Sequence, residues 1–357
     1  MSQKDQVVLV INPGSTSTKL ALCTRTATVL ATKVEHPTAQ LQSFPTVASQ
    51  FSWRLGLVEE FLAGFHGQLR AVVGRGGLLR PVPGGTYRVN QKILAELEAG
   101  AWGEHASNLG ALLAHAVAAP LGLEAFIVDP VVVDELAEHA RVSGWPGIER
   151  RSVFHALNHK AVARRAAAEL GRGYQELALV VAHLGGGITV GAHLEGKVID
   201  VNNGLDGEGP FSPERSGALP VTGLFRLVVG RPGEAAGFLS RVAGRGGLVD
   251  HLGTSDAQVV EERIRAGDGR ARLVYEAMAY QVAKEIGRAA ASLGRRADAV
   301  VLTGGLAHSA YLTGLIVPRV AWVASTVLVY AGEEEMLALN AGAWRVLDGL
   351  EKVREYD

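Results

Sequence analysis

The amino-acid sequence predicts an α/β protein built from two related domains. Two β-hairpin patterns of the same kind, at residues 7–23 and 177–194, lie about 170 residues apart, which is one domain length. Other segments place apolar residues at every third or fourth position, as amphipathic helices do. The chain has 357 residues, which is enough for two domains of ordinary size. Strands interspersed with helices indicate the α/β class.

The first hairpin joins strands predicted at residues 7–11 and 19–23 through a loop of turn-forming residues. The loop begins at Asn12 and contains Ser15 and Ser17, and Lys19 follows it. Backbone amides and hydroxyls of such a loop can hold a phosphate, and the lysine adds positive charge. The spacing is not that of a P-loop. The alternative is an ordinary hairpin turn.

The second hairpin joins strands predicted at 177–182 and 188–193, and residues 197–201 continue the alternation as a third strand. Its loop begins at His183 and contains three consecutive glycines, Gly185, Gly186 and Gly187. Three glycines cost backbone entropy. Close approach of a ligand to the backbone would account for them, and a tight turn with a bulge is the alternative.

Helical periodicity occurs in the segments 91–98, 108–121, 153–170, 256–266, 273–293 and 333–352. A strand predicted at 299–302 runs into Gly304 and Gly305, and a helix is expected from residue 309. Such a transition leaves backbone N–H groups where a ligand can approach. Residues 202–220 are rich in Gly, Pro, Asp and Ser, and we expect a loop there.

Several charged residues stand where ligands commonly bind. Arg75 and Arg215 both lie near glycines, and a guanidinium in such a place suits a carboxylate or phosphate. Asp129 follows a predicted strand, and α/β proteins bind ligands outside the carboxyl ends of strands. His155 and His159 are four residues apart on a predicted helix, but the HExxH glutamate of a zinc site is absent. A capping or core role is the alternative for these histidines.

The overall charge disfavours nucleic-acid and anionic-membrane binding. Thirty-five Lys and Arg residues balance 36 Asp and Glu residues, which gives a net charge of −1, whereas nucleic-acid binders usually carry a basic excess. Cys23 is the single cysteine, so an internal disulfide and a cysteine zinc cluster are excluded. This fits a cytoplasmic protein, and the N-terminal apolar run is too short for a signal peptide.

Four segments closely resemble the butyrate kinases, a group within the acetokinase family. The segments are residues 10–19, 153–165, 183–187 and 200–217, of which the last is the longest and most specific. The resemblance extends over nearly the whole chain. It implies the fold of the sugar kinase, heat-shock ATPase and actin superfamily, with two ribonuclease H-like domains and a nucleotide cleft between them. We expect the first domain at 1–150 plus 334–357 and the second at 151–333.

The resemblance also implies a reaction. The expected activity is reversible phosphorylation of butanoate, or a similar short or branched acid, by ATP with Mg²⁺, giving an acyl phosphate and ADP. An acetate, propionate or branched-chain acid kinase would share the same motifs. An ATPase switch protein of the same superfamily is a more distant alternative. The family expectation for assembly is a homodimer or a higher homo-oligomer, with no nucleic-acid or membrane partner.

Site residues follow from the family motifs, position by position. Catalytic roles are implied for Arg75, Asp129, His155 and Arg215. Nucleotide and phosphate binding is implied for Asn12, Ser15, Ser17, Lys19, His183, Gly185, Gly186, Gly187, Gly304 and Gly305. The acyl pocket is implied at Arg75, Gly76, Gly77 and His105, and the magnesium carboxylate at Glu334 or Glu335. The last pair begins the final predicted helix, where complementing the helix dipole is the alternative role.

Two departures from acetate kinases favour a butyrate kinase. Gly186 stands where acetate kinases have asparagine, and Gly76 and Gly77 stand where they have a pair of valines. Loss of the valine side chains is expected to widen the acyl pocket. One methylene changes discrimination in such a pocket by roughly 1–3 kcal/mol.

Overall fold

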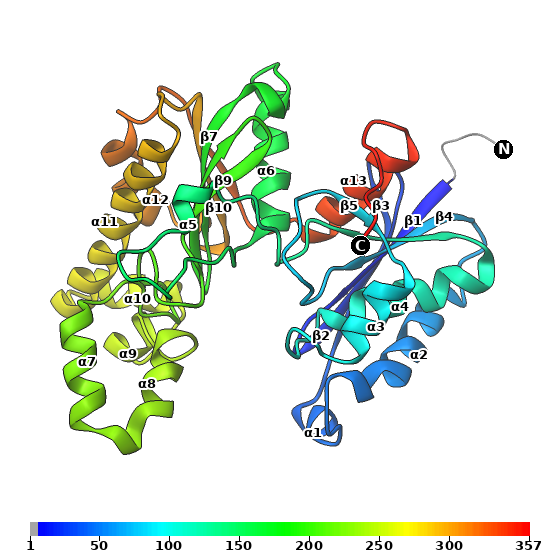
Figure 1. Ribbon diagram of the computed structural model, residues 1–357, viewed down its shortest axis with the longest axis horizontal. Helices are drawn as coiled ribbons and strands as arrows, with labels where there is room; N and C mark the ends of the chain where they lie inside the picture. Colours follow the sequence, from blue (N-terminus) through cyan, green and yellow to red (C-terminus); the bar gives the residue numbers. More distant parts are fainter. Residues whose placement is uncertain (1–5) are drawn as a thin grey trace. The chain divides into compact units, whose positions relative to one another are not determined.

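The computed structural model describes residues 6–357, apart from the side chains of Ala235 and Ala236, and it divides into two compact units (Figure 1). The described part of unit 1 is residues 6–133 and 334–357, and unit 2 is residues 134–333. Residues 134–150, which we expected in the first domain, therefore lie in unit 2. No helix within residues 6–357 combines the length and the apolar character needed to cross a membrane.

Unit 1 contains a mixed sheet in the order β3-β2-β1-β4-β6-β5. β1 pairs antiparallel with β2 and parallel with β4, and β4 pairs parallel with β6. The strands are β1 Gln6–Pro13, β2 Ser17–Cys23, β3 Thr28–Glu35, β4 Gln68–Arg75, β5 Thr86–Arg88 and β6 Glu124–Val128. The helices are α1 Thr38–Gln42, α2 Phe51–Leu62, α3 Gln91–Glu98, α4 Asn108–Ala118 and α13 Glu335–Leu347.

Helices cover both faces of the unit 1 sheet. Alternate side chains of a strand point to opposite faces. On β6, Ile127 joins the apolar core that includes Leu109 of α4. The next residue, Val128, meets α13 so closely that a Cβ at Gly342 would lie 2.5 Å from its Cγ1. Residues 335–347 therefore return to complete unit 1, although unit 2 separates them from the rest of it in the chain.

Unit 2 contains a second mixed sheet in the order β11-β10-β7-β8-β9. β7 pairs antiparallel with β8 and parallel with β10. The strands are β7 Ala178–Leu184, β8 Ile188–Leu194, β9 Lys197–Val201, β10 Ala299–Gly304 and β11 Val327–Ala331. The helices are α5 Glu138–Arg141, α6 Ala156–Glu169, α7 Val221–Gly230, α8 Ala235–Val242, α9 Leu248–Leu252, α10 Ala257–Arg265, α11 Gly269–Ser292 and α12 Ala310–Val320.

Helices also cover both faces of the unit 2 sheet (Figure 1). Val180 of β7 joins the core that includes Met278 of α11 and Leu312 of α12. Val181, the next residue, joins a separate core with Ala163 of α6. Burial on both faces explains why residues 177–184 form a nearly continuous apolar run.

The two sheets repeat one pattern. The order β3-β2-β1-β4-β6 of unit 1 matches β9-β8-β7-β10-β11 of unit 2, with the same parallel and antiparallel pairings. The prediction of two related domains is therefore confirmed. The hairpin forms the first two strands of each unit, but in unit 2 the helices α5 and α6 precede it. The predicted loop at 202–220 is also confirmed, because β9 ends at residue 201 and α7 begins at residue 221.

Candidate active-site clusters

The first loop is a tight turn that a buried arginine stabilises through hydrogen bonds. The Gly14 N–H donates to the Ser17 carbonyl at 2.8 Å, which closes the turn. The guanidinium of Arg54, which has no exposed surface, donates to the Gly14 carbonyl at 2.9 Å and to Thr18 Oγ1 at 3.0 Å. Burial lowers the pKa of Arg54 to about 10. The sequence analysis missed this residue, although an arginine in an otherwise apolar segment is a usable signal.

The polar residues of the first loop differ in exposure. Ser15 is exposed at the turn, and Ser17 is buried at the start of β2. Lys19 is exposed and stands directly opposite Asn12 in the β1–β2 register. Opposed residues of an antiparallel pair share a face of the sheet. Phosphate binding by Ser15, Ser17 and Lys19 remains a prediction.

A three-residue cluster forms at the carboxyl ends of β1 and β4 in unit 1. The Arg75 guanidinium forms an ion pair with the Glu335 carboxylate, and Arg75 Nη1 also reaches Asn12 Oδ1 at 3.5 Å. Asn12 Nδ2 donates to Glu335 Oε2 at 2.8 Å. Glu335 is the first residue of α13, whereas Glu334 is the exposed residue at its N-cap. Of the two candidate magnesium carboxylates, the structure joins Glu335 to Arg75.

Asp129 and His105 lie near this cluster in unit 1. Asp129 follows β6, as expected, and is buried with a left-handed φ of 39°. Its Oδ1 accepts a hydrogen bond from the Gly85 N–H at 2.7 Å. A residue held in this backbone region is strained, which is common where side-chain direction matters. Burial and the charge of Arg75 lower the pKa of His105, which is consistent with its predicted place beside Arg75.

The glycines after Arg75 do not widen a pocket in the way that we expected. A Cβ at Gly76 would lie 2.5 Å from Pro130 Cβ, and a Cβ at Gly77 would lie 2.6 Å from Asn108 Cα. The space that larger side chains would take is already filled by this chain itself. The expectation is therefore corrected: these glycines permit close packing around Arg75, and they leave no added room for an acyl group.

The second loop, residues 183–187, connects β7 and β8 in unit 2. His183 is buried, and its Nδ1 lies 2.8 Å from Asn158 Oδ1. Its Nε2 lies 3.1 Å from the carboxylate of Glu333, a residue whose place beside this loop the sequence did not reveal. The Gly186 carbonyl accepts a hydrogen bond from Ser212 Oγ at 2.6 Å. The loop is thus fixed by side chains from three separate parts of unit 2.

Arg215 lies against the second loop. A Cβ at Gly187 would overlap the Arg215 guanidinium. Arg215 Nη1 donates to the Gly204 carbonyl at 2.8 Å. Burial lowers the pKa of Arg215, and Glu214 partly opposes that shift. One reason for glycine at 187 is therefore visible: the position accommodates a guanidinium of the same chain, where we had expected a ligand.

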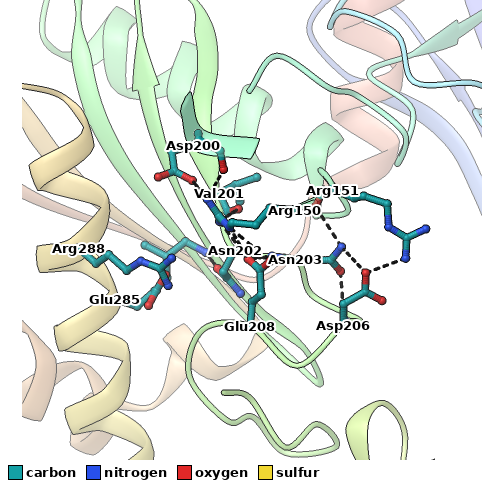
Figure 2. A network of polar contacts seen from close by, with 12 residues as sticks. Arg150, Arg151, Asp200, Val201, Asn202, Asn203, Asp206, Glu208, Glu285 and Arg288 are labelled. Carbon is teal, nitrogen blue, oxygen red and sulfur yellow. Dashed lines mark hydrogen bonds and ion pairs between the residues drawn. The ribbon is translucent and has the colours of Figure 1, made fainter. Parts of the chain in front are cut away.

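A partly buried ion cluster holds the segment 200–217 that carries Arg215 (Figure 2). Arg150 donates to Asp200 at 2.8 Å and to Glu208 at 2.9 Å, and also to the Val201 carbonyl. Burial opposes its charge, but Glu208 and Asp200 together raise the pKa of Arg150 above its ordinary value. Burial also disfavours the charged form of Glu285 beside this cluster, and so raises the pKa of that carboxyl. One guanidinium thus bridges the two carboxylates of Asp200 and Glu208.

His155 stands just before α6 in unit 2. Its ring stacks on His183 with centroids 3.8 Å apart, and its Nδ1 lies 3.0 Å from Thr189 Oγ1. His159, one helical turn later, has no exposed surface and contacts the same hydroxyl through Nε2 at 3.0 Å. The two histidines therefore share a partner on β8, and His159 is the core histidine of the pair.

The glycine turn after β10 has one closed and one open side. Gly304 has a φ of 89°, and a Cβ there would overlap the backbone of Leu184. A Cβ at Gly305 would meet nothing within 4 Å, and the residue is exposed. Gly305 is therefore the member of the pair that a ligand can approach, and its role with adenosine remains a prediction.

The acidic residues of unit 1 suit Mg²⁺ better than a metal ion whose ligands all come from the protein. Across residues 6–357, no group of three or more His, Cys, Asp or Glu side chains is arranged to hold a metal ion. Mg²⁺ needs less, because it keeps several waters and usually takes one or two carboxylates together with substrate phosphates. Asp129 and Glu335 offer carboxylates of this kind, so the residues fit the ion that the family implies.

Comparisons with known proteins agree with this organisation. Residues 145–320 match the model of the acetokinase family. The fold resembles acetate kinase from Porphyromonas gingivalis, with a TM-score of 0.78 and 20% identity over 96% of this chain and 100% of that chain. A propionate kinase from Francisella tularensis matches with a TM-score of 0.72 and 20% identity, over 94% of this chain and 98% of that chain. Acetate kinase from Entamoeba histolytica matches with a TM-score of 0.74 and 16% identity, over 95% of this chain and 99% of that chain.

These structural likenesses extend over both units and confirm the predicted fold class. The matched segment 145–320 contains His155, the loop at 183–187 and the segment that carries Arg215. At these identities the structural matches concern the fold, and the similarity to the acetokinase family model concerns the matched segment. Residues 145–320 match the acetokinase family model, and the whole chain has the fold of the acetate and propionate kinases.

Proposed function

We propose that this protein is a short-chain fatty acid kinase, which transfers the γ-phosphoryl group of ATP to the carboxylate of a small acid. The observation that carries the proposal is the arrangement within the family-matched segment. There, the Arg215 guanidinium is packed on the glycine loop, and His155 stacks on the first residue of that loop. A cation and a hydrogen-bond donor fixed at a glycine loop suit a phosphoryl group.

The chemistry demands charge neutralisation and alignment above all. A carboxylic acid with a pKa near 4 is already an anion at pH 7, so a general base is unnecessary. One carboxylate oxygen forms a bond to the γ-phosphorus while the bond from that phosphorus to the bridging oxygen of ADP breaks. Both reactants are anions, and the site must overcome their repulsion. Guanidinium groups held in place serve this purpose, because their planar donors match carboxylate and phosphate oxygens.

We assign roles to the residues accordingly. Arg75 orients the substrate carboxylate, and Glu335 and Asn12 hold the Arg75 guanidinium in place. Arg215 stabilises the charge on the transferred phosphoryl group, and His155 donates a hydrogen bond to it. The loops at 12–19 and 183–187 hold the nucleotide phosphates, and Gly305 contacts the adenosine. Mg²⁺, when bound with the nucleotide, neutralises phosphate charge, and Asp129 and Glu335 are the carboxylates that would hold the ion or its waters.

Within this class we propose butanoate, or an acid of similar size, as the preferred substrate. The support is the resemblance of four segments to butyrate kinases, above all residues 200–217. The packing of Pro130 against Gly76 removes the separate argument from a widened pocket. Acetate and propionate therefore belong in the same test, because the structures that share this fold include an acetate kinase and a propionate kinase.

The decisive experiment traps acyl phosphate with hydroxylamine, using ATP, Mg²⁺ and a series of acids from acetate to valerate with isobutyrate. We expect acid-dependent product, with the highest kcat/KM for a four-carbon acid. A maximum at acetate would keep the kinase and reject butanoate. ATP hydrolysis that no acid alters would reject the kinase.

A matched pair of variants tests the observation that carries the proposal. Arg215→Ala removes the guanidinium at the loop, and we expect turnover to fall at least about a hundredfold, as for loss of a transition-state charge partner. Arg319→Ala removes an exposed arginine of α12 in the same unit, and we expect wild-type turnover. Full activity of Arg215→Ala would exclude Arg215 from the reaction.

A further inference from the structure

A continuous chain of hydrogen bonds runs through unit 2 and ends at His155. Tyr174 Oη lies 2.8 Å from His193 Nδ1, and His193 Nε2 lies 3.3 Å from His159 Nδ1. His159 Nε2 lies 3.0 Å from Thr189 Oγ1, and that oxygen lies 3.0 Å from His155 Nδ1. His193 and His159 use both of their ring nitrogens within the chain, and His155 joins it through Nδ1. The proposed function gives no part to the four residues behind His155.

Burial restricts the protons that this chain can hold. His159, His193 and Thr189 have no exposed surface, and Tyr174 is 6% exposed. Burial lowers the pKa of His159 and of His193 well below the ordinary value, so both rings are neutral. A neutral imidazole has one N–H donor and one accepting nitrogen, and a hydroxyl has one proton to donate. The two neutral imidazoles must therefore donate in the same direction, and the buried Thr189 hydroxyl satisfies its own proton by donating to the ring nitrogen that does not donate to it.

The phenol selects between the two possible directions. A neutral imidazole nitrogen is a far stronger base than a phenol oxygen, so the Tyr174 hydroxyl donates to His193. Two cations beside the Tyr174 ring strengthen this preference by making the phenol a better donor. Lys160 Nζ lies 5.8 Å and Arg164 Cζ lies 5.7 Å from the ring centroid. With this start, His193 and His159 each donate from Nε2, and the Thr189 hydroxyl donates to His155 Nδ1.

We propose that Tyr174, His193, His159 and Thr189 are positioning residues that hold His155 in the tautomer with its proton on Nε2. That tautomer presents an N–H donor at the far side of the ring, whereas the other would present a lone pair. An anionic phosphoryl oxygen attracts the donor and repels the lone pair. The significance of the tautomer for catalysis rests on the proposed function, but the tautomer itself does not.

The tautomer can be measured directly by ¹⁵N NMR of protein labelled at histidine, since protonated and unprotonated ring nitrogens differ strongly in chemical shift. At pH 8.5, where an ordinary imidazole is neutral, we expect His155 to show a single Nε2–H form. His155→Gln identifies its signals. An Nδ1–H form or an even mixture in the wild-type protein would overturn the proposal, whatever the activity. A clean Nε2–H form in a protein without acid-dependent turnover would uphold it and reject the kinase.

Tyr174→Phe removes the donor that sets the direction, and Tyr330→Phe is its matched control. Tyr330 is also buried in unit 2. Its hydroxyl donates to Glu169 at 2.7 Å and takes no part in the hydrogen-bond chain that ends at His155. Both variants lose one phenol hydrogen bond, so we expect similar losses of thermal stability. Only Tyr174→Phe should give mixed His155 tautomers and lower kcat, roughly tenfold at nearly constant KM, the rate equivalent of about one hydrogen bond. Unmixed tautomers in Tyr174→Phe would overturn the proposal.

A second pair of variants tests the middle of the chain. Thr189→Val keeps the shape of the side chain and removes the hydroxyl, so His155 loses its donor and should show both tautomers. Thr189→Ser keeps the hydroxyl and should restore the Nε2–H form and most of the turnover. Equal behaviour of the two variants in the NMR spectrum would show that the hydroxyl does not set the tautomer.

Discussion

At the scale of single residues, the guanidinium of Arg215 depends on the absence of a side chain at Gly187. The guanidinium fills the space that a side chain at position 187 would need, since a Cβ at Gly187 would overlap it. Arg215 also donates to the Gly204 carbonyl, and a Cβ at Gly204 would lie 2.9 Å from Arg215 Nη1. Two glycines from different loops thus form the surface on which this arginine rests.

Gly187→Ala should therefore displace Arg215 without adding any chemical group to the site. A displacement of about 1 Å in a positioning group can lower turnover roughly a hundredfold. We expect that loss in kcat for acyl phosphate formation, with far-UV circular dichroism unchanged. Gly314→Ala, on the exposed side of α12 where a Cβ meets nothing within 4 Å, is the control and should retain turnover. Wild-type kcat in Gly187→Ala would show that Arg215 tolerates the shift.

At the scale of elements, the long loop before α7 is ordered by charge and hydrogen bonds. Arg150 holds Asp200 of β9 and Glu208 of the loop together. Ser212 and the Glu214 N–H, later in the same loop, both donate to the Gly186 carbonyl. The loop that carries Arg215 is thus tied at its start to the Arg150 cluster and near its end to the glycine turn.

Arg150→Met should release this loop while keeping most of the side-chain volume. Asp200 and Glu208 would then repel each other in a partly buried place. Removing one partner of a buried pair costs up to about 3–5 kcal/mol, and we expect about 2 kcal/mol of lost unfolding free energy at this half-buried site, measured by urea denaturation. Turnover should fall as well, because Arg215 loses its support. Arg288→Met, which removes the exposed ion-pair partner of Glu285, is the control. An equal loss of unfolding free energy in that variant would contradict the role assigned to Arg150.

Elements with strong local signals were the ones that the sequence predicted well. The segment 91–98 coincides with α3, and the three strands predicted between 177 and 201 coincide closely with β7, β8 and β9. The helices α7 and α8 were missed. Val221, Phe225 and Leu239 on them are more than two-thirds exposed, so their apolar pattern does not report a buried face. Pattern analysis assumes that apolar residues face a core, and that assumption fails for these two helices.

Site residues divided along a similar line. The sequence singled out Arg75, Arg215 and Asp129 because they stand beside glycines or at strand ends, and those positions are local properties. It missed Arg54 and Glu333, whose contacts with the two loops join residues far apart in the chain. It also misjudged Gly76 and Gly77, because the neighbours that fill their space come from other elements. Contacts of this kind become visible only when the fold brings distant segments together.

At the scale of the whole molecule, neutral buried histidines make stability depend on pH in both units. Burial, with the charge of Arg54, lowers the pKa of His36 in unit 1 to about 4. In unit 2, burial lowers the pKa of His159 and His193 well below the ordinary value. An unfolded histidine takes up its proton near pH 6.5. Between that pH and the folded pKa the unfolded chain binds more protons, so acidification favours unfolding.

We therefore expect the free energy of unfolding to fall between pH 7.5 and pH 5.5, by about 1 kcal/mol for each such histidine. Urea denaturation at the two pH values measures the loss. His36→Gln should reduce the pH-dependent loss by about 1 kcal/mol, whereas the exposed His66→Gln should leave it unchanged. Stability that rises on acidification, or an unaltered slope in His36→Gln, would contradict the neutral state of these buried rings.

The return of α13 to unit 1 has a consequence for synthesis on the ribosome. Unit 2 lies between the two parts of unit 1 in the chain, so its residues leave the exit tunnel before Glu335 does. Unit 2 can therefore complete its core while unit 1 still lacks the helix that covers Val128. The carboxylate that pairs with Arg75 arrives with that helix. A nascent chain thus gains the Arg75 ion pair only after the translation of unit 2 is finished.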